Sequence, residues 1–274
     1  MLQVDQYLKH GGFMLKKLLF FSLFIVIIYM WTSSCSPREP ESEEEDGTEV
    51  FMKDTACALT KTEDAGQSYI DSFVFLGEST TYHLKSRGVL SEGKETKQVW
   101  APKSGTLMLD PSTASCRILY PETNEEMDIA EAMAKKKPKY MLLTFGLNGA
   151  VGNMSKGSEY FKSCYRKLVN RLHEASPDTV IILQSCFPVA ADMDTSGYSV
   201  DVSTLNSYID KTNEWTALLA SECGLPYLNT AEALKDADGF LKECYDSGDG
   251  FHLNTEAYRE VLEYIKTHAY GGAE

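Results

Sequence analysis

The sequence predicts an α/β protein, a three-layer α/β/α sandwich built on a mostly parallel sheet. Short, continuous apolar runs bounded by turn residues are typical of parallel strands that helices cover on both faces. Segments with the apolar spacing of amphipathic helices alternate with these runs, as the crossovers of a parallel sheet require. The composition, with 43% hydrophobic and 24% charged residues among 274, allows a sizeable core.

Three apolar runs have the character of buried strands, at residues 72–77, 140–146 and 179–185. A weaker run lies at 225–230, and we expect a further short strand near 97–101. Their length and their turn-forming flanks favour strands over helices.

Four segments between or after the strands carry helical patterns. The first has an acidic start and a basic end, which suits the helix dipole. The third ends at Gly224, a suitable C-cap, and the fourth begins at Asn254, a suitable N-cap. The four predicted helical segments are residues 124–137, 157–176, 202–224 and 254–269.

The N-terminal residues have the pattern of an export signal. Lys16 and Lys17 precede an unbroken apolar stretch at 18–31, which is shorter than the roughly 20 residues of a spanning helix. The small residues before Cys35 resemble a lipobox, although Thr32 stands where leucine is preferred. We therefore expect residues 1–35 to direct export and Cys35 to become a lipid anchor on the outer side of the cytoplasmic membrane. A plain signal peptide and secretion is the alternative.

The segment that follows is polar, acidic and proline-containing, so we expect residues 36–50 to be a solvated tether and 51–274 to be one folded domain. The net charge of −14 argues against nucleic acid as a partner. Membrane contact is expected only through the N-terminal segment. The remaining six cysteines have no regular spacing, and their pairing stays open.

A serine ends the first strong strand, with no proline or Asn-Gly turn to explain the stop. In FVFLGESTTYHL, residues 73–84, the apolar run gives way to Gly-Glu-Ser and leaves Ser79 at the carboxyl end of the strand. Ligands of open α/β sheets bind beyond these ends. A serine hydroxyl becomes a good nucleophile when an imidazole takes its proton and a carboxylate orients that imidazole. Helix capping by Ser79 is the other explanation.

Among five histidines, His252 is the best partner for Ser79. It lies in the glycine-rich segment SGDGFHLNTEAY, with Asp249 three residues before it. A short turn there would bring the carboxylate to ring Nδ1 and leave Nε2 free. His83 follows Ser79 by four residues, and we expect it to point away from the strand end. Taken alone, Asp249 and His252 are equally explained as a capping aspartate and a surface histidine.

An amide donor follows the second strong strand. In TFGLNGAVGN, residues 144–153, Asn148 lies between two glycines at the same edge of the predicted sheet. A side-chain NH₂ group at this edge is a suitable donor for the oxyanion of acyl transfer.

Gly-Glu-Ser after the first strand, Gly-Leu-Asn-Gly after the middle strand and Asp-Gly-Phe-His before the last helix occur in one order along the chain. In this order they resemble the motifs of the SGNH (GDSL-type) hydrolase family, from about Asp71 to Tyr270. The resemblance implies the flavodoxin-like sheet of the SGNH hydrolase fold. It also implies a catalytic triad of Ser79, His252 and Asp249.

The same resemblance implies an oxyanion hole made by the backbone N–H of Ser79, the amide of Asn148 and a glycine N–H. Our candidate for that glycine is Gly105 in APKSGTLML. The sequence departs from the family pattern at Glu78 and Gly149, where the family usually has aspartate.

The resemblance implies a serine esterase that cleaves a carboxylic ester without a metal or organic cofactor. The expected substrate is a small acyl ester or an O-acylated glycan, with a lipid ester as a further candidate. Because Glu78 and Gly149 depart from the pattern, a non-catalytic carbohydrate-binding module on a degenerate SGNH fold is an alternative. An O-acyltransferase with the same triad is another.

Overall fold

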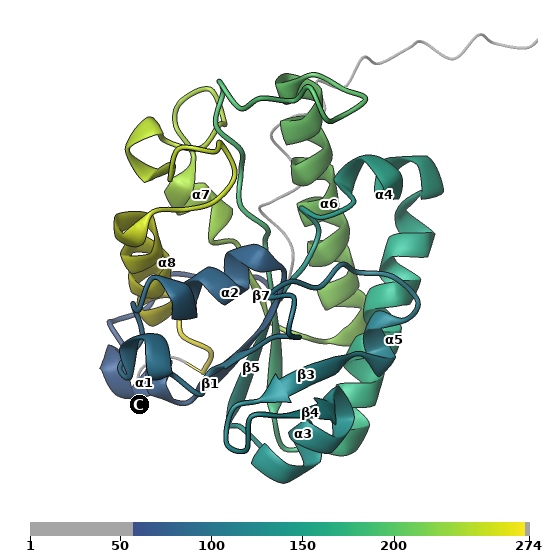
Figure 1. Ribbon diagram of the computed structural model, residues 1–274, viewed down its shortest axis with the longest axis vertical. Coiled ribbons are helices and arrows are strands. Elements are labelled where there is room, and N and C mark those ends of the chain that lie inside the picture. The colour runs from purple at the N-terminus through teal and green to yellow at the C-terminus, as the bar shows by residue number, and fades with distance from the viewer. Residues whose placement is uncertain (1–56, 272–274) are drawn as a thin grey trace, which may run out of the picture. The chain divides into compact units, whose positions relative to one another are not determined.

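A computed structural model of the protein describes residues 57–271, and a five-stranded sheet forms its centre. The strand order is β2-β1-β5-β6-β7, and every neighbouring pair is parallel. Figure 1 shows the strands between the helices. The five strands are β2 (Val99–Trp100), β1 (Phe73–Gly77), β5 (Tyr140–Thr144), β6 (Val180–Gln184) and β7 (Tyr227–Leu228). The prediction of a parallel α/β/α sandwich is confirmed.

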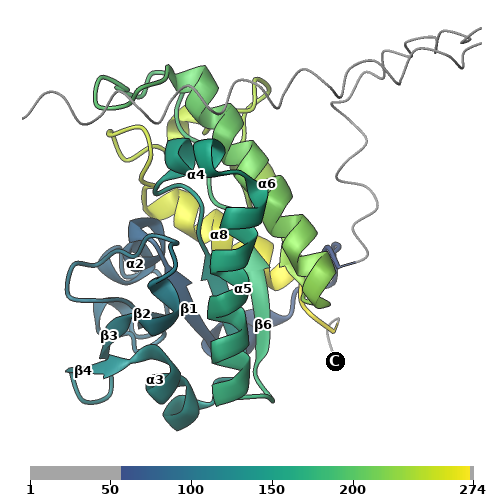
Figure 2. The ribbon, with the colours of Figure 1, turned by 90° about the vertical axis from the view of Figure 1, so that its right-hand side faces the viewer.

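Helices cover both faces of the sheet, as Figure 2 shows with α5 and α8 on opposite sides. Alternate residues of β1 supply the two cores, with Val74 and Leu76 in one and Phe73 and Phe75 in the other. The first core is closed by α3 (Ile129–Lys136), α5 (Ser158–Ala175) and α6 (Val202–Cys223). The second is closed by α1 (Gly66–Asp71), α2 (Ser79–Ser86), α7 (Ala231–Leu234) and α8 (Thr255–Thr267).

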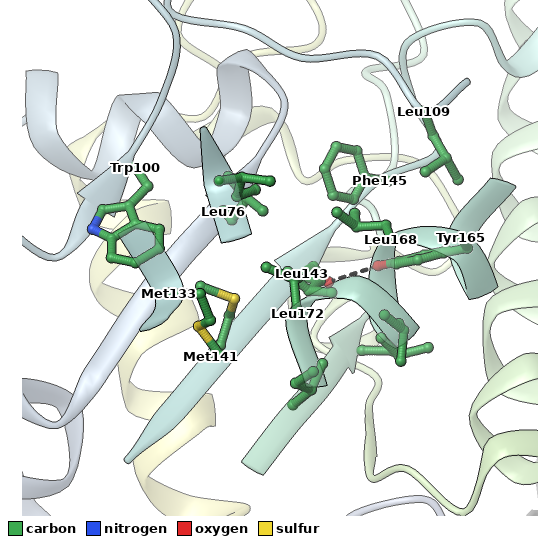
Figure 3. Packing of buried hydrophobic residues seen from close by; sticks show 14 of the residues in the cluster. Leu76, Trp100, Leu109, Met133, Met141, Leu143, Phe145, Tyr165, Leu168 and Leu172 are labelled. Atoms are coloured by element: carbon green, nitrogen blue, oxygen red, sulfur yellow. Dashed lines mark hydrogen bonds between the residues drawn. The ribbon is translucent and has the colours of Figure 1, made fainter. Parts of the chain in front are cut away.

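Helix α5 holds the middle strand in place. Figure 3 shows Leu168 and Leu172 of α5 against Met141 and Leu143 of β5. The hydroxyl of Tyr165 donates a hydrogen bond of 3.0 Å to the carbonyl oxygen of Leu143. Truncating a buried leucine to alanine typically costs about 2–5 kcal/mol, so this packing fixes the strand from which the Asn148 loop extends.

The segment before α3 corrects our prediction of one helix over 124–137. Instead, β4 (Glu125–Asp128) pairs antiparallel with β3 (Arg117–Tyr120), and the helix begins only at Ile129. Asp128 ends the strand because its carboxylate accepts hydrogen bonds from two backbone N–H groups in the first turn of α3. In β4, Met127 is buried and the two glutamates before it are exposed.

The other three predicted helices are present as α5, α6 and α8. Gly224 ends α6 in a left-handed conformation, and the Asn254 side chain caps α8 by accepting from the N–H of Ala257. Helix α4 (Ala150–Lys156), which follows the Asn148 loop directly, was not predicted.

The predicted export signal, lipidated Cys35 and acidic tether lie outside the described residues, as do the first residues of the predicted domain. Between residues 57 and 271, no helix has the length and apolar character needed to cross a membrane. The six cysteines within this range form no disulfides with one another.

Candidate active site

The turn between β1 and α2 presents Ser79 at the edge of the sheet. Ser79 is the first residue of α2, and Glu78 before it has an extended backbone. Gly77 makes the turn possible, because a Cβ there would lie 2.3 Å from the carbonyl oxygen of Thr144 and 2.4 Å from Oγ1 of Thr81. As the first residue of a helix, Ser79 has a backbone N–H without an acceptor in that helix.

The loop before α8 presents His252 from the other side. Oδ1 of Asp249 accepts hydrogen bonds from the N–H groups of Phe251 at 3.1 Å and His252 at 2.8 Å, which closes a tight turn. Gly250 has φ of +83°, and a Cβ there would lie 2.5 Å from Cβ of Met193. Both facts require glycine at this position.

The side chains of Ser79, His252 and Asp249 form a chain of hydrogen bonds. Nε2 of His252 lies 3.0 Å from Oγ of Ser79, although the residues are 173 positions apart. Nδ1 of His252 lies 2.7 Å from Oδ2 of Asp249. Because the carboxylate accepts from Nδ1–H, Nε2 of the neutral ring is left as the acceptor for the serine proton.

Asp249 remains ionised in this arrangement. Partial burial opposes ionisation, but hydrogen bonds from the N–H and ring of His252 and from the N–H of Phe251 outweigh it and hold the pKa of Asp249 below its ordinary value. Helix α2, which begins with Ser79, is also tied to α8, which follows the His252 loop, since the hydroxyl of Tyr258 in α8 donates to the carbonyl oxygen of Thr80 at 2.6 Å.

Glu78 links the serine turn to the loop after β5. Its carboxylate is 1% exposed and accepts hydrogen bonds from three successive backbone N–H groups. The bond from Gly146 is 3.0 Å long, that from Leu147 is 3.1 Å and that from Asn148 is 3.0 Å. Burial raises the pKa of Glu78 to about 8, although the three N–H groups oppose the rise.

The two predicted oxyanion donors besides Ser79, namely Asn148 and Gly105, already donate hydrogen bonds to other groups in the structure. Asn148 sits on the loop that Glu78 holds, and its Nδ2 donates to Oγ1 of Thr106 and to the carbonyl oxygen of Leu107, both at 3.0 Å. The N–H of Gly105 donates to the carbonyl oxygen of Pro102 at 2.9 Å. The N–H of Gly105 is thus used within a tight turn, just as the NH₂ group of Asn148 is used by its own partners. Both oxyanion-hole assignments stay predictions.

The sequence profile of the GDSL-like Lipase/Acylhydrolase family matches residues 75–260, more than half of the chain. The chain belongs to this family. It is therefore a hydrolase that acts on ester bonds, as predicted from the three motifs. The matched range begins within β1 and ends within α8, so it contains every element that carries the site.

Several solved structures are similar to this family member at low sequence identity. A Streptococcus pneumonia protein described as a platelet activating factor is 17% identical over 77% of this chain and 93% of its own, with a TM-score of 0.50. A GDSL-like lipase from Bacteroides thetaiotaomicron is 15% identical over 73% of this chain and 88% of its own, with a TM-score of 0.46. An acylhydrolase from Bacteroides fragilis is 16% identical over 70% and 83%, with a TM-score of 0.46. No curated protein matches the chain.

A second histidine of this GDSL family member lies against His252, contrary to our expectation. The ring centroids of His83 and His252 are 4.3 Å apart with an interplanar angle of 37°. The ring of Phe251 also packs on His252, at 4.0 Å. The spacing of Ser79 and His83 was itself the available signal, because residues four apart share one face of a helix.

A cleft of about 360 Å³ adjoins Asn148. Its rim carries two exposed apolar side chains, with Met108 51% and Tyr198 44% accessible to solvent. The cleft is lined by Thr106, Leu107, Met108, Leu147, Asn148, Gly149 and Tyr198. A larger cavity of about 520 Å³ lies at the opposite edge of the sheet, around the start of β1 and the Lys136–Lys139 segment, and contains no residue of the site.

Within residues 57–271, no three or more His, Cys, Asp or Glu side chains are grouped so as to hold a metal ion. The prediction that the enzyme needs no cofactor stays a prediction.

Proposed function

We propose that this chain is a serine esterase in which Ser79 is the nucleophile, His252 the general base and acid, and Asp249 the group that orients the imidazole. The observation that carries the proposal is the continuous contact from Oγ of Ser79 to His252 and on to Asp249, at 3.0 and 2.7 Å. These separations lie within the hydrogen-bond reach that proton transfer needs.

In the first half of the reaction, Nε2 of His252 takes the proton of Ser79 while Oγ bonds to the ester carbonyl carbon. The carbonyl oxygen becomes an oxyanion, which the free N–H of Ser79 at the start of α2 stabilises. When this intermediate collapses, the bond to the alcohol breaks and His252 gives the alcohol its proton. The acyl group stays on Ser79.

In the second half, water attacks the acyl-enzyme and His252 accepts its proton. Collapse then releases the acid and returns the proton to Ser79. Asp249 stabilises the imidazolium formed in both halves and keeps the ring in the tautomer with a free Nε2.

Asn148 joins the oxyanion hole only if it gives up one of its present contacts. Its NH₂ group has two hydrogens, and Thr106 and Leu107 accept both. Thr106 is the easier partner to lose, because its hydroxyl can rotate. We infer that substrate binding turns one N–H of Asn148 from Thr106 towards the oxyanion.

The test is hydrolysis of p-nitrophenyl esters by the native protein and by Ser79→Ala. We expect the native protein to release p-nitrophenol and the variant to lose three or more orders of magnitude in kcat. Glu63→Gln, at an exposed position, serves as the control and should keep the native activity. A native protein with no activity on any ester would favour the carbohydrate-binding module.

The acyl group is expected to be short, and a small acyl ester or O-acylated glycan remains the proposed substrate. The exposed apolar side chains of Met108 and Tyr198 lie beside Asn148, where a longer acyl chain would also find apolar contacts. The length of the preferred acyl chain is therefore the property to measure. Comparing acetyl, butyryl and octanoyl esters decides it. A preference for acetyl that persists in Met108→Ala supports the short-chain proposal, and a preference for octanoyl rejects it.

We also propose that the enzyme is exported and anchored through Cys35, where it would meet surface substrates. The support is the sequence pattern of residues 16–35. Mass analysis of the mature N-terminus tests the proposal. We expect the mature chain to begin at a lipidated Cys35. An uncleaved chain, or an unmodified N-terminus at another residue, would reject the anchoring proposal.

A further inference from the structure

The imidazole of His252 is held by more than the two hydrogen bonds in its plane. The ring of His83, from the same helix as Ser79, packs on it with centroids 4.3 Å apart. The triad hydrogen bonds fix Nδ1 and Nε2 but resist tilting of the ring only weakly. The His83 ring, inclined by 37° to the imidazole and packed on it, opposes that tilt.

His83 is built to remain neutral in this position. Burial is the main cause that lowers its pKa to about 4, and the nearby charges of His252 and Arg87 add to it, while Asp249 opposes them. Nδ1 of His83 is buried and has no hydrogen-bond partner among the described residues. Arg87 is the C-cap residue of the same helix, and Asp249 and His252 belong to the loop packed against it.

We propose that His83 is a positioning residue, whose neutral ring packs on His252 and keeps Nε2 aligned with Ser79. The inference rests on the proposed function. The proposal concerns the His83 ring as a packing surface, because Nδ1 of His83 has no hydrogen-bond partner among the described residues and His252 is already the proposed proton acceptor. A charge at this position would instead repel the imidazolium that forms when His252 takes the serine proton.

Three substitutions of His83 distinguish a role of its ring, an effect of charge at its position and no role in catalysis. We expect His83→Ala to lower kcat by about 10- to 100-fold with little change in KM, because a small misplacement of catalytic groups has this effect. His83→Phe restores a neutral ring and should recover most of kcat. His83→Lys should lower kcat and also move the acid limb of the pH–activity profile to lower pH, because a fixed positive charge disfavours protonation of His252. Lys85→Ala, on the same helix, is the control and should match the native enzyme.

A second readout does not depend on activity. The proton between Nδ1 of His252 and Asp249 should give a low-field NMR signal in the native protein and in His83→Phe, and the signal should broaden or vanish in His83→Ala. Native kcat in the alanine variant, an unmoved acid limb in the lysine variant, or a low-field signal that stays sharp in the alanine variant overturns the proposal. Loss of kcat in the phenylalanine variant overturns it as well.

Failure of the esterase proposal would look different. The native protein and all variants would then be inactive, and the NMR signal alone would decide whether His83 orders His252.

Discussion

Glu78 shows how one side chain can assemble two loops of a site. It directly precedes Ser79, yet its carboxyl group accepts three hydrogen bonds from the loop after β5. The three N–H donors belong to the residues that lead to and include Asn148. The departure from the aspartate of the family pattern therefore leaves the position with a structural task.

Replacing Glu78 tests that task. In Glu78→Ala, one buried and two partly buried N–H groups lose their acceptor, and we expect the free energy of unfolding to fall by about 3 kcal/mol or more. We expect kcat to fall by about 100-fold, since the loop carrying Asn148 loses its register with Ser79. Glu78→Asp keeps the carboxyl group and should lose less of both quantities. Urea denaturation and ester hydrolysis measure them, and equal losses in the two variants would contradict the role of the carboxylate.

At the scale of elements, the strands were predictable and the loops were predictable only in part. Continuous apolar runs between turn residues have few alternatives to parallel strands, so 72–77, 140–146 and 179–185 were found. The β3–β4 hairpin was missed because its glutamates on an exposed strand look like the acidic start of a helix. Only the capping role of Asp128 marks the boundary.

The candidate site was likewise predictable from the sequence only in part. Ser79, His252 and Asp249 were predictable because a turn of three residues fixes how a carboxylate meets a ring, and the structure brings all three together. The spacing of His83 from Ser79 places both on one face of α2, but the contact with His252 also depends on how α2 packs against the loop before α8. The hydrogen bond within the turn at Gly105 is likewise visible only in the folded chain.

The hydrogen bonds of Asp249 in the loop before α8 should make the stability of the protein depend on pH. The folded state lowers the pKa of Asp249, so the unfolded chain binds more protons at acidic pH and stability falls as pH falls. The stabilisation from Asp249 is present above the ordinary aspartate pKa of about 3.9 and is lost as pH drops through the lower folded value.

Chemical denaturation of native protein and Asp249→Asn from pH 6 down to pH 3 measures this effect. The stability difference between them should be largest at pH 6 and shrink towards pH 3. Asp192→Asn, at an exposed aspartate, should follow the native curve at every pH. A difference that is constant across the range would show that the carboxylate is not paired as described.

For the whole molecule, the parallel sheet is what brings distant segments to one rim. The turn after β1, the loop after β5 and the loop before α8 supply Ser79, Asn148 and His252. Helices on both faces hold the strands in register, and the bond from Tyr258 to Thr80 ties the last helix to the nucleophile turn. The fold therefore contributes geometry, and the chemistry comes from a few side chains at its edge.

The central claim is that His252 activates Ser79 for attack on a carbonyl or an equivalent electrophile. Reaction of the native protein with a fluorophosphonate, followed by peptide mass mapping, tests it most directly. We predict one adduct, on Ser79, forming at least a thousand-fold more slowly in His252→Ala. An adduct on another residue, or an unchanged rate in the variant, would contradict the account.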